Sequence, residues 1–418
     1  MKKVIALLLV LVMVFALAAC GENGNNNAAP GGGDNSGGGQ ASGGGTSGGG
    51  DNSGGQTGGD TGVKLDGSWP EETIKIGVEA FDTTDESFLA VMEYFEHLGE
   101  YFNVEIVISE TLNAAEDEFN FINNCAAAGC KGIFGYYNIA GDEAIKQATS
   151  LGMYYWGTEG SYNNMAEDPN YVGTYTFSDV NDASAKNGEY LAGYEIGYTM
   201  ANSGLEHLVF CNGGAAIGIP MFIDRQAGVL DGIAAAQAEG SATRFDPATD
   251  IIEGFPNDAW FAAQAAALAG DYDGLVITFD AFTWFQPIME SGKDFKVGCI
   301  GTVNDTYKTF VENGTVIALV YDCGEVVFGS VFANIVNAAT GHLELTRGAD
   351  GKALLNPTQR WVLTNPDDFN AVYEKHSRGE YFITPEDMAS ILGGANPDAT
   401  VNDVIALFDL SLADALKK

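Results

Sequence analysis

The chain has 418 residues, of which 55 are glycine, and its 57 acidic and 19 basic side chains give a formal net charge of −38. Residues 21–62 hold 19 of the glycines but only four of the acids, so residues 63–418 keep 53 acidic and 17 basic side chains, a net charge of −36. This charge excludes nucleic-acid binding through a basic patch, and its simplest role is to keep an exported protein soluble. Because one core rarely organises the 356 residues of this body, we expect two lobes.

The first twenty residues have the features of an export signal. Two lysines precede an unbroken apolar run over residues 4–19, which is short of the roughly twenty residues that a membrane-spanning helix needs. The run ends in the sequence LAAC, which resembles the lipobox of bacterial lipoproteins and implies that Cys20 is lipidated. An ordinary signal with a chance cysteine is the alternative. We predict a lipoprotein signal peptide over residues 1–20.

Residues 21–66 are mainly Gly, Ser, Asn, Thr and Asp, and we predict that they form a disordered tether. A flexible chain of this length reaches roughly 30–40 Å, enough to hold a domain off a membrane surface. No later segment is apolar for long enough to cross a bilayer. The sequence therefore predicts an exported protein, anchored to the outer face of the cell membrane through its N-terminus.

From residue 73 onward, short β-branched or aromatic runs alternate with longer helical stretches. The predicted strands are 74–78, 104–109, 132–137, 153–156, 207–211, 274–279, 296–300 and 315–320. The predicted helices between them are 85–100, 112–128, 141–150, 180–202, 219–238, 257–269, 303–312 and 324–340, and three further helical pieces lie near 367–376, 385–392 and 401–416. Runs that are apolar at nearly every position suit parallel strands covered on both faces. We predict an α/β fold with two doubly wound, Rossmann-like lobes and parallel sheets.

Ligands of such sheets bind beyond the carboxyl ends of the strands, so the residues that follow each strand matter most. Aromatic and carboxylate side chains recur there, in the segments 79–88, 136–138, 157–159, 280–284 and 302–305. This mixture suits a hydroxyl-rich or cationic small ligand, because rings stack and carboxylates accept hydrogen bonds.

The sequence contains no recognisable catalytic or cofactor motif. Its four histidines have no partner at metal-ligand spacing, and no nucleophile elbow or ATP-binding loop occurs. Gly213, Gly214 and Gly218 do not complete a dinucleotide fingerprint. We predict no catalytic residues, metal or cofactor. The alternatives are a glycosidase using Asp82 and Asp85, or an adhesion module of the cell envelope. Cys125 and Cys130 are close enough in sequence to bridge, although nothing requires it.

Several motifs occur in a familiar order. They are the polar and aromatic loop 81–88, Glu159 at the end of the fourth strand, Arg225 in an Arg-x-x-Gly pattern, Asp280-Ala281, and the Val-Gly-x-x-Gly strand at 297–301. From about residue 73 to about residue 341 the chain resembles bacterial sugar-binding proteins of the ribose/galactose type, the solute receptors of ABC importers. Three positions depart from that pattern, where Phe279, Ile300 and Tyr321 replace expected hydrogen-bonding side chains.

The resemblance implies a multi-strand hinge with crossings near 177–179, 319–322 and 356–361. The N-terminal lobe would comprise 67–177 and 322–356, and the C-terminal lobe 178–321 and 357–418, including a helical extension. The implied protein is a monomeric receptor that binds a sugar between its lobes and docks on an ABC transporter permease. Because of the aromatic replacements, a nucleoside, cationic or signalling ligand stays open. The expected ligand-binding residues are Phe81, Asp82, Asp85, Phe88, Asn138, Glu159, Arg225, Asp280, Phe282, Trp284 and Tyr321.

Overall fold

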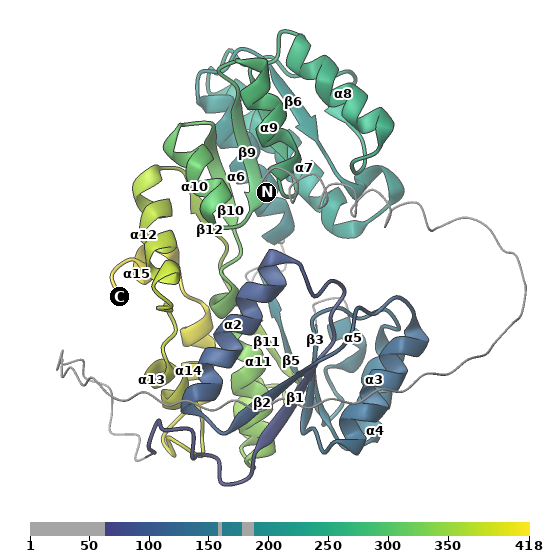
Figure 1. The fold of residues 1–418 in the computed structure, drawn as a ribbon, viewed down its shortest axis with the longest axis vertical. Helices are drawn as coiled ribbons and strands as arrows, with labels where there is room; N and C mark the ends of the chain where they lie inside the picture. The colour runs from purple at the N-terminus through teal and green to yellow at the C-terminus, as the bar shows by residue number, and fades with distance from the viewer. Residues whose placement is uncertain (1–62, 158–160, 178–187) are drawn as a thin grey trace, which may run out of the picture. The chain divides into compact units, whose positions relative to one another are not determined.

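The computed structural model describes residues 63–157, 161–177 and 188–418, which belong to one compact unit (Figure 1). The predicted signal peptide, the predicted lipidation site Cys20 and the predicted tether up to residue 62 lie outside the described residues, as does Glu159. In the described part of the chain, no helix is both long and apolar enough to cross a membrane.

The N-terminal lobe is built on a six-stranded sheet in which all neighbouring strands run parallel, in the order β11-β5-β4-β3-β1-β2. Its strands are β1 (Ile74–Val78), β2 (Val104–Ile108), β3 (Gly132–Gly135), β4 (Tyr154–Gly157), β5 (Tyr171–Thr176) and β11 (Leu354–Pro357). Its helices are α2 (Glu86–Tyr101), α3 (Ala115–Ala127), α4 (Asp142–Ser150), α5 (Tyr162–Met165), α11 (Gly324–Ala339) and the 3-10 helix η3 (Leu343–Thr346).

The C-terminal lobe has a second six-stranded sheet, in the order β12-β10-β9-β8-β6-β7, and only β12 is antiparallel to its neighbour. Its strands are β6 (Leu208–Cys211), β7 (Ile251–Ile252), β8 (Gly274–Ile277), β9 (Lys296–Gly301), β10 (Val316–Tyr321) and β12 (Trp361–Leu363). Its helices are α6 (Gly188–Asn202), η2 (Gly214–Ile217), α7 (Pro220–Ala238), α8 (Asp258–Ala269), α9 (Phe282–Ser291) and α10 (Asp305–Glu312).

These sheets confirm the predicted doubly wound α/β fold. Strands β3, β6 and β8 are buried at every residue, as parallel strands covered by helices on both faces should be. Several of the covering helices begin with a polar side chain that caps the helix N-terminus in the loop after a strand. Asp85 accepts a hydrogen bond from the Phe88 amide at 2.8 Å, and Asn304 accepts one from the Tyr307 amide at 2.9 Å.

In the described residues, the chain passes between the sheets at two of the three predicted crossings. Strand β10 ends at Tyr321 in the C-terminal sheet, and the next helix, α11, packs on the N-terminal sheet. Strand β11 belongs to the N-terminal sheet and β12, four residues later, to the other. The remaining connection runs from β5 to α6 through residues 178–187, which lie outside the described residues.

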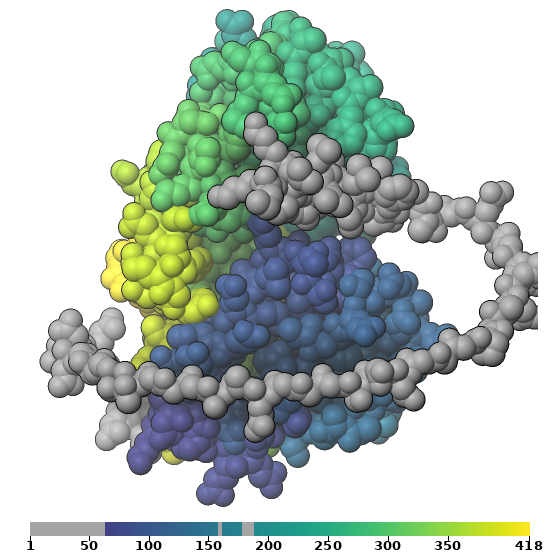
Figure 2. Space-filling view, in the orientation of Figure 1, coloured from purple at the N-terminus to yellow at the C-terminus, as the bar shows by residue number. Residues whose placement is uncertain are grey.

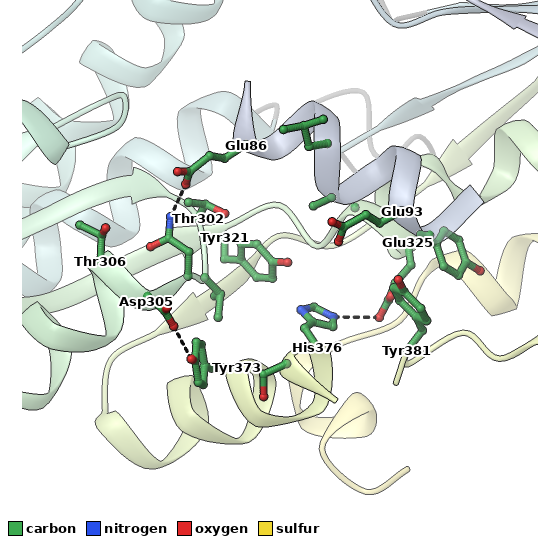
Figure 3. Close-up of a pocket in the computed structure, with 17 residues that line it drawn as sticks. Glu86, Glu93, Thr302, Asp305, Thr306, Tyr321, Glu325, Tyr373, His376 and Tyr381 are labelled. Carbon is green, nitrogen blue, oxygen red and sulfur yellow. Dashed lines mark hydrogen bonds and ion pairs between the residues drawn. The ribbon is translucent and has the colours of Figure 1, made fainter. Parts of the chain in front are cut away.

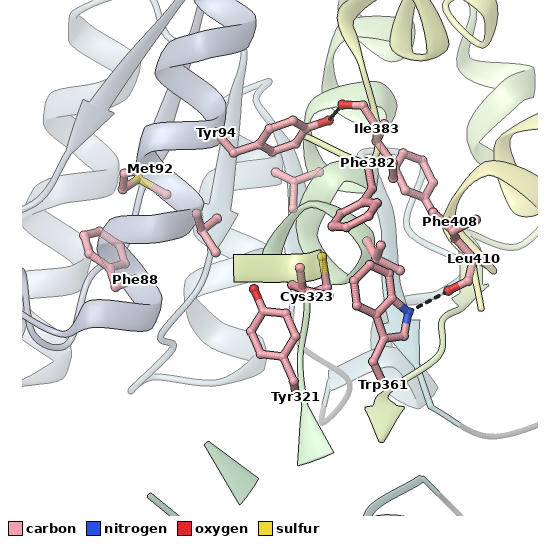
Figure 4. Packing of buried hydrophobic residues seen from close by; sticks show 14 of the residues in the cluster. Phe88, Met92, Tyr94, Tyr321, Cys323, Trp361, Phe382, Ile383, Phe408 and Leu410 are labelled. Carbon is pink, nitrogen blue, oxygen red and sulfur yellow. Dashed lines mark hydrogen bonds between the residues drawn. The ribbon is translucent and has the colours of Figure 1, made fainter. Parts of the chain in front are cut away.

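The C-terminal extension consists of α12 (Pro366–Ser377), α13 (Pro385–Ser390), α14 (Val401–Phe408) and α15 (Leu412–Ala415). Helix α12 contacts α10 and β12 of the C-terminal lobe, whereas α14 contacts α11, β11 and η3 of the N-terminal lobe. Figure 2 shows the extension, in yellow, along one flank beside both lobes. The Tyr94 hydroxyl donates to the Ile383 carbonyl and the Trp361 indole to the Leu410 carbonyl (Figure 4). The extension is therefore shared between the lobes rather than confined to the C-terminal one.

Several short elements were not predicted. Residues 171–176, for which no strand was predicted, form β5 inside the first sheet. Helix α9 was missed because its sequence is aromatic and contains Pro287 in its interior. Strands β7, β11 and β12 have two to four residues each, too few to show a hydrophobic period. The five cysteines in the described part are all buried and form no disulfide, so Cys125 and Cys130 are not bridged.

Helices α6 and α7 cross closely, and glycines lie at their contact. A Cβ atom at Gly193 would lie 2.0 Å from the Arg225 carbonyl oxygen, and one at Gly228 would lie 2.0 Å from the Tyr190 carbonyl oxygen. Gly197 is similarly constrained, since its Cβ would lie 2.5 Å from the carbonyl oxygen of Val229. This crossing fixes the backbone that carries Arg225 toward the hinge.

Candidate ligand-binding site

A cavity of about 500 Å³ lies at the carboxyl ends of both sheets, and we call it the cleft cavity. Asp85, Tyr136 and Phe328 line it from the N-terminal lobe. Further lining residues come from the C-terminal lobe and the second crossing: Phe222, Arg225, Phe279, Asp280, Ile300, Thr302, Tyr321 and Asp322. All three positions at which the sequence departs from the sugar-binding pattern therefore line this cavity.

A network of ion pairs lies beside the cleft cavity and joins the segments at the hinge. The Arg360 guanidinium, between β11 and β12, lies 2.7 Å from Asp322 Oδ1 and 2.7 Å from Glu189 Oε2. Arg225 Nε lies 2.5 Å from the same Glu189 oxygen, and its Nη1 donates to the Thr278 carbonyl at 2.8 Å. Glu189 and Arg360 were not predicted as functional residues, because only the fold brings their segments together.

Charge compensation explains why this network is stable although it is largely buried. The Arg360 and Arg225 side chains are 8% and 7% exposed. Burial opposes ionisation of Glu189, but the two guanidinium groups outweigh it and hold the pKa of its carboxyl below the ordinary value. The same balance raises the pKa of Arg360, since burial is outweighed by Asp322 and Glu189. The cleft cavity thus has a positively charged side chain whose charge is already neutralised.

Asp280 and Asp85 provide carboxylates from opposite walls. Asp280 follows β8 and accepts a hydrogen bond from the Phe282 amide at 2.8 Å. Burial raises the pKa of the Asp280 carboxyl, and the negative charges of Glu86 and Asp85 add to this effect. A hydroxyl-rich or cationic ligand between the walls would relieve this unfavourable burial by hydrogen bonding to the carboxylate.

Of the eleven predicted binding residues, Asp85, Arg225, Asp280 and Tyr321 line the cleft cavity. Three others from the N-terminal lobe have local partners instead. Phe81 is 55% exposed and packs on Tyr137, with ring centroids 4.6 Å apart. Asp82 accepts hydrogen bonds from the Thr84 hydroxyl and amide, which lower its pKa. Asn138 donates to the Tyr155 hydroxyl at 3.0 Å and to the Gly141 carbonyl at 3.1 Å.

Three aromatic residues that were predicted to contact ligand do not line the cleft cavity. Phe88 is 1% exposed and packs on Tyr136, because it lies on the buried face of α2. Trp284 is fully buried and stacks on Phe295, because α9 turns its ring into the core. Phe282, at the start of the same helix, is 56% exposed and does not line the cleft cavity. Glu159, the remaining prediction, lies outside the described residues.

A buried carboxyl pair lies just below the end of β1. Glu79 is fully buried, and its Oε2 accepts a hydrogen bond from the Tyr155 hydroxyl at 2.6 Å. Glu118 accepts hydrogen bonds from the amides of Ile139 and Ala140 at 3.0 and 2.7 Å. Burial raises the pKa of Glu79 well above 4.5, and the neighbouring Glu118 raises it further. These carboxyls support the loop after β3 rather than line the cleft cavity.

A second cavity, of about 510 Å³, lies between α2, the loop before α10 and helix α12, and we call it the flank cavity (Figure 3). Among the described residues, its lining includes Glu86, Glu93, Glu325, Tyr373 and His376 but no lysine or arginine. The Asn304 amide donates to Glu86 and the Tyr373 hydroxyl to Asp305, so both lobes and the extension contribute. The sequence could not indicate this cavity, because α12 completes it.

No family model matches the chain, and no curated protein matches its sequence. Solved structures do resemble it. A galactofuranose-binding protein has 16% sequence identity and a TM-score of 0.54, over 74% of this chain and 100% of that one. A carbohydrate transporter from Acidothermus cellulolyticus, in complex with myo-inositol, has 17% identity and a TM-score of 0.52, over 74% and 100%.

The same fold also occurs in regulators. The transcriptional repressor ascG of Escherichia coli has 13% identity and a TM-score of 0.50, over 70% of this chain and 98% of that one. At such identities the likeness shows the fold alone. The chain has the two-lobed fold of type I periplasmic binding proteins, to which sugar-binding proteins of the ribose/galactose type belong.

Proposed function

We propose that the chain is a lipid-anchored extracytoplasmic receptor that binds a small sugar-like ligand between its lobes and delivers it to an ABC-type importer. The main supporting observation is that residues from both lobes line the cleft cavity at the strand ends. A ligand that contacts both walls stabilises the closed arrangement, which a permease can recognise. The receptor is a monomer without catalytic chemistry or a cofactor, and the N-terminal signal with Cys20 supports its export.

The composition of the cavity favours a neutral polyol. Asp85 and Asp280 are positioned to accept hydrogen bonds from hydroxyl groups, while Tyr136, Phe222 and Phe328 offer rings for the apolar face of a sugar. The volume of about 500 Å³ lies within the usual range for small-molecule sites. Structures of this fold contain myo-inositol and D-allose, which supports including polyols and hexoses among the candidates.

A cationic ligand is the second candidate, and one observation favours it. The cleft cavity is lined by the carboxylates of Asp85 and Asp280, for which the described residues provide no ion-pair partner. Its other charged side chains are already paired, Asp322 with Arg360 and Arg225 with Glu189. The aromatic side chains around them are suited to cation–π contacts with an amine or to stacking with a nucleoside. An organic cation would compensate the charge of the carboxylates without disturbing the hinge network.

A thermal-shift screen of the full-length chain tests the proposal. The compounds are myo-inositol, galactose, allose, arabinose and ribose, with adenosine and choline representing the other ligand classes. A sugar at about 100 times its dissociation constant should stabilise the protein by about 2.7 kcal/mol, which gives a clear rise in melting temperature. Asp280→Asn and Asp85→Asn should each reduce the response. If no sugar or polyol shifts the melting temperature, or if both variants respond as the wild type does, the sugar receptor is ruled out.

A further inference from the structure

Three side chains with different metal-binding atoms come together beside the flank cavity, which two of them line. They are Cys323 at the start of α11, Glu325 in its first turn and His376 near the end of α12. Their sulfur, oxygen and nitrogen atoms all lie within 4.8 Å of one another. His376 Nε2 lies 3.4 Å from Glu325 Oε1 (Figure 3). No sequence motif links them, because α12 reaches this position only through the tertiary fold.

The surrounding structure holds these side chains in place. Cys323 is fully buried, the Glu325 side chain is 2% exposed and that of His376 is 23% exposed. The Phe382 amide donates to Glu325 Oε1 at 2.7 Å, which fixes the carboxylate. The His376 ring packs against the ring of Phe382, with centroids 5.6 Å apart. Backbone donors and packed rings of this kind orient the ligands in protein metal sites.

The burial of the Glu325 side chain favours a cation beside it. A carboxylate that is removed from water is costly unless a positive charge or hydrogen bonds compensate it. Among the described residues, His376 is the one basic side chain within ion-pair distance of Glu325. One divalent ion with a thiolate and a carboxylate would give a neutral group, and neutral His376 would add a third bond without adding charge.

We propose that Cys323, Glu325 and His376 bind one divalent transition-metal ion, with Zn²⁺ as the best match. Sulfur, imidazole and carboxylate ligands suit zinc, whereas calcium and magnesium prefer oxygen alone. Glu325 and His376 line the flank cavity, so a fourth position faces its interior and is open to water or to a small donor molecule. Binding displaces the thiol proton of Cys323 to solvent. The ion would link the second hinge crossing directly to the extension.

Metal binding to the purified full-length chain tests this site, with Cys20→Ala in every sample so that the N-terminal thiol does not contribute. Equilibrium dialysis should show one Zn²⁺ per chain. Co²⁺ in its place should give an intense near-ultraviolet charge-transfer band, because cobalt bonds to a thiolate. Cys323→Ser should abolish that band. Glu325→Gln and His376→Ala should each weaken binding by about tenfold or more, since even indirect metal contacts contribute 10- to 100-fold.

Matched variants distinguish the site from other thiols and imidazoles. Cys299→Ser changes another buried free cysteine, and His342→Ala changes another histidine beside a glutamate; both should bind metal as before. Glu325→Gln keeps an oxygen for the Phe382 amide, so it should remain folded even if Cys323→Ser does not. Absence of stoichiometric binding, or unchanged binding in Glu325→Gln and His376→Ala, would overturn the proposal. Because no sugar is involved, the outcome is independent of the proposed transport function.

Discussion

Two cavities of nearly equal size lie on either side of Tyr321, and they are built differently. The walls of the cleft cavity come from strand ends of both sheets, and they include a neutralised arginine and several rings. The flank cavity depends on α12 of the extension, and its charged lining is acidic apart from His376. The two share Ala90, Thr302, Tyr321 and Gly324, so both include the end of hinge strand β10. A movement of the lobes must therefore change both cavities together.

The largest expected effect comes from Arg360, whose ion pairs connect hinge segments on the cleft side. Arg360→Ala leaves Asp322 without its guanidinium partner and Glu189 with Arg225 alone. Removing one partner of a buried pair typically costs about 3–5 kcal/mol, and we expect the lower end because Asp322 is 33% exposed. Urea unfolding followed by circular dichroism measures the loss.

Arg378→Ala is the control for that measurement. Arg378 pairs with Glu380 on the surface, with both side chains about half exposed, and its loss should have no measurable effect. If Arg360→Ala were as stable as Arg378→Ala, the buried ion pairs beside the cleft cavity would not stabilise the hinge. The proposed difference between the cleft cavity and the flank cavity would then be wrong.

The next effect concerns ligand binding and separates the two cavities directly. Asp280→Asn, in the cleft cavity, should weaken binding of the ligand found in the screen by about ten- to a hundredfold, because a hydrogen bond to a charged group contributes about 1.5–3 kcal/mol. Asp305→Asn, in the flank cavity, should leave the affinity unchanged. Isothermal titration calorimetry compares the variants. An equal loss of affinity in Asp280→Asn and Asp305→Asn would show that the ligand does not bind specifically in the cleft cavity.

The third effect is a pH dependence of folding stability that arises from the buried residue Glu79. Burial raises the pKa of folded Glu79 above its ordinary value of 4.5. Its protonated form is therefore favoured in the folded state, and the stability it provides is complete below pH 4.5 and lost as pH rises through the folded pKa. Glu79→Gln, which is always neutral, should gain stability relative to wild type as pH increases. A difference between the two proteins that is constant from pH 4 to 9 would contradict this.

The smallest effect is expected at the surface of the flank cavity. Tyr373→Phe removes the hydrogen bond to Asp305 but keeps the aromatic ring. The Lys308 Nζ atom lies 4.2 Å from the centroid of that ring. We expect no change in sugar affinity and no measurable change in stability. A calorimetric loss of affinity comparable to that of Asp280→Asn would mean that the flank cavity, rather than the cleft cavity, takes the ligand.

The residues that could be predicted from sequence are those whose position depends on local pattern. The first strand was predicted at residues 74–78, as observed. A short run of mainly apolar residues is enough to recognise a buried parallel strand. Asp85 and Asp280 were placed correctly at the cleft because parallel strands end at a common edge. The two lobes followed from length and from the repeat of strand and helix.

Positions that depend on helix rotation or distant segments were not predictable in the same way. Phe88 shares the buried face of α2 with Val91, Met92 and Phe95, and this helical spacing was a signal that favoured the core. Trp284 gave no such signal, since α9 was not recognised. Arg360 and His376 acquire their partners from segments far away in the chain, and no local pattern could identify those partners.

The close crossing of α6 and α7 determines which positions of the C-terminal lobe can vary. Any side chain at Gly193, Gly197, Gly228 or Gly232 would run into backbone atoms of the opposite helix. A larger residue at one of these positions would force the two helices apart. A substitution in the cavity lining would leave the helices in place and change only which ligand fits. The lobe can therefore acquire new specificity at the strand ends while the helix pair behind them stays constant in sequence.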